Sequence, residues 1–281
     1  EKFLAKHLGG RYQTDATDRI QKRLSEITVN PDSVTMPDTT TQASKSTGEV
    51  SGFAMIDGTT LKPATLSYDA TVKMGGRSID LSSTQTFAAT STNGTDTWTL
   101  VNKIKTPRGT QTDSLIANRS SLLPMSRYRS GVPTINITFT DTSASGKMKM
   151  RGQSVSINKH LDGPTLAGGA HDVIALSAMP LEKGFSTTLR VFSPQDQATK
   201  QADFEVTGME TVKTPAGSFE TYAVDLTVGD GDVTGTVHLR KAAPHYLVKW
   251  RTEVATPRGS RTIIQTLSSM EVGRASSSSS R

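Results

Sequence analysis

Apolar and polar residues alternate almost throughout residues 50–272, with the period of two that is typical of strands with one buried face. Turn signals such as Asn93-Gly94 and Ser145-Gly146 interrupt the alternation at short intervals. We therefore expect a long antiparallel sheet that forms either a strongly curved half-barrel or a closed barrel. The alternation is clearest in four runs: Trp98, Leu100 and Ile104; Ile135, Ile137 and Phe139; Tyr222, Val224 and Leu226; Tyr246, Val248 and Trp250.

One inner segment, GGAHDVIALSAMPL, has the pattern of a short helix instead. Val173, Ile174 and Leu176 crowd one side, Asp172 suits the first turn, and Pro180 is expected to end the element.

The two ends of the chain differ from the middle. Residues 1–34 predict one or two helices, with Gly9-Gly10 ending the first and Ile20, Leu24 and Ile27 sharing one face of the second. Residues 35–49 have the polar, aperiodic composition of a linker, and residues 273–281 form a serine-rich tail that we expect to be disordered. The fold class is thus mainly β, with an antiparallel β-domain at residues 50–272.

The sequence Thr-Pro-x-Gly occurs three times, at Thr106, Thr214 and Thr256. Proline presets the φ angle of a turn and glycine can adopt a left-handed conformation, so each copy predicts a hairpin. An alternative is an anion site at one rim, because Arg108 and Arg258 occupy the x position in two copies. The third copy has Ala216 there, which favours the architectural interpretation.

Composition narrows the classes of function. The chain has no cysteine, which excludes disulfides and thiolate chemistry, and its formal charge of +6 is spread over 32 basic and 26 acidic residues without a block of like charge. Nucleic acid is therefore not an expected partner. No apolar run approaches the roughly 20 residues of a membrane span, and no signal peptide leads the chain, which begins at Glu1.

Common catalytic and nucleotide-binding motifs are absent from the sequence, and we predict no metal and no cofactor. No two of the five histidines stand three or four residues apart: His7, His160, His171, His238 and His245. His238 alternates with Val237 and Leu239, which places it on the solvent side of its strand.

Three short stretches carry possible chemistry. His171-Asp172 is either a base with its orienting carboxylate or a polar helix start, and adjacent helical residues do not normally touch. Residues 229–232, Gly-Asp-Gly-Asp, suit a tight acidic turn better than a calcium loop. Arg127 and Arg129 share a face opposite Tyr128, which is typical of a strand with one wet side.

Large, adaptable side chains inside the sheet suit either a dry core or a cavity for an apolar ligand. Met148, Met150 and Met179 are the adaptable ones. The residues expected to line the concave face are Trp98, Leu100, Ile137, Phe139, Leu176, Tyr222, Val224, Val248 and Trp250.

The stretch EKFLAKHLGGRYQ, with DRIQKRLSEITVNPDSVT after it, resembles the C-terminal helix and tail of prolyl-oligopeptidase-type, dipeptidyl-aminopeptidase-like serine peptidases. The resemblance covers residues 1–35. It implies that the catalytic serine, aspartate and histidine precede Glu1, so no catalytic residue maps onto this chain and His7 is not the triad histidine.

The rest resembles a bacterial family of envelope β-domains of unknown function, similar to the half-barrels of periplasmic lipoprotein carriers. The resemblance rests on NRSSLLPMSRYRSG, HDVIALSAMPLEKGFSTTLRVF, VTGMETVKTPAGSFETYAVDL and PHYLVKW. It implies a periplasmic or secreted protein and carries no catalytic residues.

We therefore expect a non-catalytic C-terminal β-domain that binds an apolar or peptide-like ligand or docks on a peptidase domain. One alternative is a fragment that stabilises an active serine peptidase or amide hydrolase whose triad lies upstream. Another is an enzyme that uses His171, Asp172 or the arginine strand.

Overall fold

The structure is a computed structural model that describes residues 51–273 except 151, 257 and 258. The chain divides into two units, residues 1–47 and 48–281, and the described residues belong to the second. The predicted N-terminal helices, the linker and the tail from residue 274 lie outside the described residues, so these domain boundaries stay predictions.

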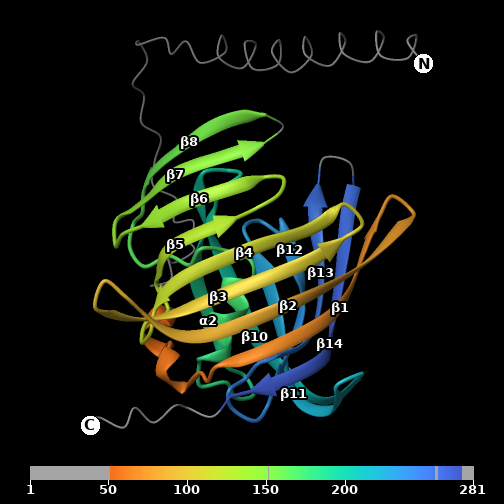
Figure 1. The fold of residues 1–281 in the computed structure, drawn as a ribbon. Helices are drawn as coiled ribbons and strands as arrows, with labels where there is room; N and C mark the ends of the chain where they lie inside the picture. Colours follow the sequence, from red (N-terminus) through yellow and green to blue (C-terminus); the bar gives the residue numbers. More distant parts are fainter. Residues whose placement is uncertain (1–50, 151, 257–258, 274–281) are drawn as a thin grey trace, which may run out of the picture. The chain divides into compact units, whose positions relative to one another are not determined.

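Fourteen strands make up most of the described chain (Figure 1). They are β1 (Ala64–Met74), β2 (Arg77–Thr92), β3 (Thr95–Thr106), β4 (Gly109–Asn118), β5 (Pro124–Arg129), β6 (Thr134–Phe139), β7 (Ser143–Met150), β8 (Gln153–His160), β9 (Ser186–Ser193), β10 (Ala198–Thr214), β11 (Gly217–Val228), β12 (Val233–Arg240), β13 (Leu247–Thr256) and β14 (Gly259–Val272).

All fourteen strands belong to one sheet in the order β8-β7-β6-β5-β4-β3-β2-β1-β14-β13-β12-β11-β10-β9. Two antiparallel meanders, β1 to β8 and β9 to β14, are joined where β1 pairs with β14. The sheet is open, because β8 and β9 are its two edges. The mainly β prediction is confirmed, and of its two forms the open one is correct.

The predicted inner helix is α2 (Ala170–Ser177), which follows Gly168 and Gly169, both at positive φ. Most of its side chains are buried, from His171 and Val173 to Ser177, because the curved sheet wraps around it (Figure 1). The sequence predicted one apolar side, but the helix is enclosed more fully than that.

Two short 3-10 helices that the sequence did not predict precede β1: η1 (Ser51–Met55) and η2 (Gly58–Thr60). The Asp57 carboxylate accepts a hydrogen bond from the Thr59 backbone N–H and caps η2. Trp98 Nε1 donates to the Gly58 carbonyl at 3.0 Å, which ties this segment to β3.

Each Thr-Pro-x-Gly copy joins two paired strands, as predicted: β3 to β4, β10 to β11 and β13 to β14. The φ angles of Gly109, Gly217 and Gly259 are 118°, 130° and 105°, in the region that favours glycine. Strand register places the first and third turns at one end of the sheet and the second at the other. The three turns therefore do not gather at one rim.

The face of the sheet that packs on α2 is called the inner face here, and its filled part is the core. Trp98, Tyr68, Tyr246 and Phe192 are the largest fully buried side chains. Met148 and Met179 are buried in this core, but Met150, at the end of β7, is 44% exposed and does not belong to it.

His238 lies on the predicted face of β12, opposite Val237 and Leu239, but it is buried there instead of exposed to solvent. His238 is 8% exposed, and its Nε2 pairs with the carboxylate of Glu210 on β10. The side chain of Glu210 therefore lies against His238 on this face.

Candidate functional site

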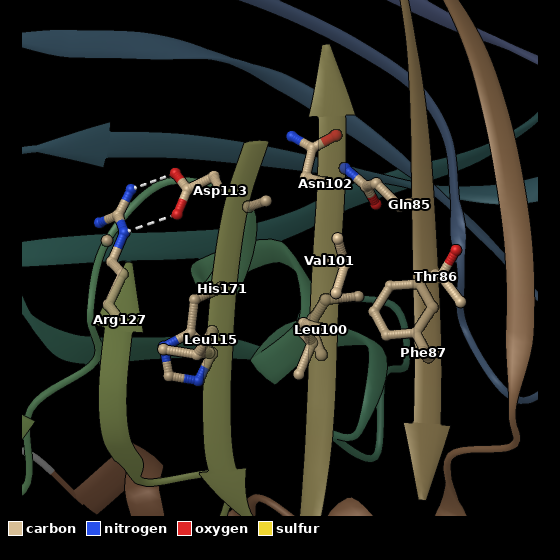
Figure 2. A pocket seen from close by; sticks show the side chains of 13 residues that line it. Gln85, Thr86, Phe87, Leu100, Val101, Asn102, Asp113, Leu115, Arg127 and His171 are labelled. Carbon is tan, nitrogen blue, oxygen red and sulfur yellow. Dashed lines mark hydrogen bonds and ion pairs between the residues drawn. The ribbon is translucent and has the colours of Figure 1, made fainter. Parts of the chain in front are cut away.

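A buried ion pair lies on the inner face between β4 and β5, where register sets Leu115 opposite Arg127 and Asp113 opposite Arg129. Arg127 Nε donates to Asp113 Oδ1 at 3.0 Å and its Nη2 donates to Oδ2 at 2.7 Å (Figure 2). The two side chains are only 10% and 22% exposed. This bidentate geometry fixes the arginine firmly in place.

The predicted wet side of β5 is therefore wrong. Arg127 points inward, where its Nη1 also donates to the carbonyl of Ala167, and Tyr128 on the opposite face is 47% exposed. The reason is Asp113: a carboxylate on the next strand supplies the partner that a buried arginine needs.

His171, in the first turn of α2, uses both ring nitrogens in hydrogen bonds. Nδ1 accepts from the Ala167 backbone N–H at 3.0 Å, so the 2.8 Å contact of Nε2 with the Leu122 carbonyl requires Nε2 to donate. Burial lowers the pKa of His171 to about 4, against the opposing effect of the Leu122 carbonyl. The imidazole is thus neutral near pH 7 and anchors α2 to two loops.

Asp172 is not hydrogen-bonded to His171. Its Oδ1 is buried with no hydrogen-bond partner, and burial raises the pKa of its carboxyl group to about 7, although Arg127 and the backbone amides of Gly169 and Gly168 act in the opposite direction. Of the two interpretations of His171-Asp172, the geometry agrees with the polar helix start.

A small pocket separates α2 from β2, β3, β4 and β5 (Figure 2). Its volume is about 30 Å³, which is room for about two water molecules. The lining residues are Gln85, Thr86, Phe87, Leu100, Val101, Asn102, Asp113, Leu115, Arg127, Gly168, Ala170, His171 and Ile174.

The structure places most of the nine residues predicted to line the concave face in the core. Leu100 alone among them lines the pocket. Six are buried in the core, namely Trp98, Leu100, Ile137, Phe139, Leu176 and Val224, whereas Tyr222 and Trp250 pack against it half-buried. Val248 is buried outside this core, beside the register shift between β12 and β13. A ligand-binding role for these residues stays a prediction.

Apolar side chains that sequence reasoning missed lie farther along the inner face, toward the tips of the β1–β2, β3–β4 and β13–β14 hairpins. Register places them on the same side as Tyr68 and Leu100. They are Val72, Leu81, Ile104, Val254 and Ile263, and each remains partly exposed. We call these five residues the open stretch. The continued alternation toward each hairpin tip was the signal that could have identified them.

Metal-binding geometry is not found in the described part of the chain, where no three His, Cys, Asp or Glu side chains converge. Residues 229–232 form the predicted turn between β11 and β12, and Asp232 accepts a hydrogen bond from Lys200 at 2.8 Å. Within residues 51–273, apart from the three that are not described, no helix is long and apolar enough to cross a membrane.

Residues 65–266 match a family described as "Protein of unknown function (DUF3108)". Comparison with curated proteins found no match. The matched region does not include residues 1–35, so the resemblance to a serine peptidase stays a prediction.

Among solved structures, the chain is similar to a β-barrel-like protein of a domain of unknown function, DUF1849, from Brucella abortus. The TM-score is 0.50 at 11% identity, over 76% of this chain and 99% of that one. A putative exported protein with a YmcC-like fold from Bacteroides fragilis gives a TM-score of 0.34 at 13% identity, over 75% of this chain and 96% of that one. The first similarity supports the fold alone.

Proposed function

The chain belongs to the family of unknown function DUF3108, and we propose that its β-domain is a non-catalytic binding domain that holds an apolar or peptide-like ligand on the inner face of the sheet. The proposal includes a periplasmic or secreted location, which rests on the resemblance to envelope β-domains.

The open stretch is the observation that carries this proposal. Its five apolar side chains face inward from five strands and remain partly exposed beyond the core. Covering apolar surface contributes about 25 cal/mol per Å², so a ligand with an apolar chain would bind favourably here. The pocket of about 30 Å³ is far smaller than ligand pockets of about 300–1,000 Å³, which favours the open stretch as the contact surface.

Two of the side chains that the sequence singled out for chemistry, His171 and Arg127, already have hydrogen-bond partners, which favours binding over catalysis. His171 is neutral and bonded at both nitrogens, and Arg127 is held by Asp113. A base or nucleophile needs a free atom directed at the substrate, and these groups lack one.

The proposal is tested by titrating the 281-residue chain with the neutral dye N-phenylnaphthylamine and following its fluorescence. We expect saturable binding that Ile263→Asp weakens at least tenfold, because a carboxylate would enter the apolar contact. Ile264→Asp, on the next residue of β14 and the opposite face, is the matched control and should leave the affinity within twofold. Equal effects of the two variants, in chains shown to be folded by circular dichroism, would contradict the proposal.

A further inference from the structure

Two arginines on the inner face have no carboxylate partner of their own. Arg129 ends β5, and Arg261 lies near the start of β14, on the same face as Leu267 and Gln265. None of the ion pairs among the described residues includes either arginine. The nearby Asp113 is already engaged through both carboxylate oxygens by Arg127.

Arg261 influences Arg129 although four strands separate β5 from β14 in the sheet. Burial lowers the pKa of Arg129; Asp113 opposes this, and the charges of Arg127 and Arg261 lower the pKa further. Because charges influence each other this way only at short range, the curved sheet must bring Arg261 near Arg129 across the inner face. Asp113 is the one carboxylate among the charges that shift the pKa of Arg129.

Hydrogen-bond donors on the same side of β13 and β14 are also unpaired. Arg261 Nε and Trp250 Nε1 are buried and have no acceptor, and both groups can only donate. Gln265, which register sets directly opposite Trp250, has an unpaired buried Nε2 as well. A buried donor without an acceptor is costly, so these atoms favour a ligand that brings acceptors.

We infer that the inner face binds an anionic amphiphile, with a carboxylate or phosphate between Arg129 and Arg261 and an apolar chain against the open stretch. Ile263 lies two residues from Arg261 on the same face, so one ligand can contact both surfaces. Guanidinium groups are well suited to both anions through paired N–H donors. This inference rests on the proposed function and adds the charge of the ligand to it.

The experiment compares octyl phosphate, octanoate, 1-octanol and inorganic phosphate by isothermal titration calorimetry with the 281-residue chain. We expect at least one of the two anionic amphiphiles to bind about tenfold tighter than 1-octanol, because charge-assisted hydrogen bonds to these partly buried arginines are stronger than neutral ones. The affinities of octyl phosphate and octanoate, compared with each other, show which anion is preferred. Inorganic phosphate alone should bind at least tenfold more weakly than the preferred amphiphile.

Arg261→Gln and, separately, Arg129→Gln should each weaken binding of the preferred anionic amphiphile about tenfold. Each should leave the affinity for 1-octanol within twofold. Arg251→Gln is the matched control, because Arg251 lies on the same hairpin with its side chain 58% exposed on the other face. The two arginine variants are independent, so the inference remains testable if one of them does not fold.

Three outcomes would overturn the inference or the proposed function on which it rests. If all the octyl compounds bind equally and the arginine variants have no effect, an apolar site remains but the anion site is wrong. If inorganic phosphate binds as tightly as octyl phosphate and both arginine variants abolish binding, the anion site stands while the apolar ligand of the proposed function is contradicted. If nothing binds, both fail.

Discussion

At the scale of single residues, the ion pair between Asp113 and Arg127 is the clearest case of a role set by a neighbour. Arg127, Tyr128 and Arg129 by themselves favoured a strand with exposed arginines, and the structure reverses that. A buried guanidinium is tolerated because both carboxylate oxygens of Asp113 and the carbonyl of Ala167 satisfy its donors. The two side chains of this ion pair line part of the pocket beside α2.

Asp113→Asn should therefore destabilise the domain by about 3 kcal/mol, because it leaves the charge of Arg127 buried without a counterion. Urea unfolding followed by circular dichroism measures this. Asp96→Asn is the control, since Asp96 is 74% exposed and 3.8 Å from Arg119, and should cost less than about 1 kcal/mol. Similar losses for the two variants would show that the buried pair has no special role.

At the scale of elements, α2 combines two titrating groups whose effects on stability oppose each other. The pKa of His171 is lowered to about 4, so between pH 4 and its ordinary pKa of 6.5 the unfolded chain holds the extra proton and stability rises with pH. The pKa of Asp172 is raised from 3.8 to about 7, so over that range the folded chain holds the extra proton and stability falls with pH. Arg127 is a charged neighbour of both groups, and Asp113 is a second charged neighbour of His171.

Asp172→Asn should remove the contribution of Asp172 to stability, which falls as the pH rises. The stability of the variant minus that of the parent chain should rise as the pH increases from 4 to 7, with a slope of at most about 1.4 kcal/mol per pH unit. Urea midpoints at pH 4.5, 5.5, 6.5 and 7.5 measure it, and the subtraction removes the titration of all other groups. For the exposed Asp141, the variant Asp141→Asn should give a flat difference. A flat difference for Asp172→Asn as well would contradict burial as the cause of its raised pKa.

At the scale of the whole molecule, the open sheet leaves two edges that are protected unequally. β8 has one buried residue, Ile157, among eight, and none of the other described strands lies beyond it in the sheet. β9 is contacted by η1, and Leu166 forms a parallel bridge with its Val191. The two edges therefore differ in local stability even though both end the same sheet.

Hydrogen exchange followed by mass spectrometry should show β8 exchanging first, well before β9 and the central pair β1 and β14. The reason is that β8 can separate from β7 while little apolar surface is exposed, whereas β9 would have to leave η1 as well. Equal protection of β8 and β9 would be inconsistent with this interpretation.

Local pattern predicted much of the fold because strand alternation, helix pattern and turn chemistry are properties of neighbouring residues. It placed the sheet, α2 and the three hairpins, and it put most of the nine named residues in the core. It did not locate the open stretch or the role of Asp113, because these depend on how far the core extends and on which strand lies beside which.

The sequence by itself thus determined the elements, their turns and which side of most strands faces inward, since period-two patterning and proline or glycine geometry act over a few residues. Only the tertiary structure decided that the sheet stays open, that Arg127 is buried against Asp113, and that Arg261 acts on Arg129 across four intervening strands. The ion pair depends on the pairing of β4 with β5, and the effect of Arg261 on Arg129 depends on the curvature of the whole sheet.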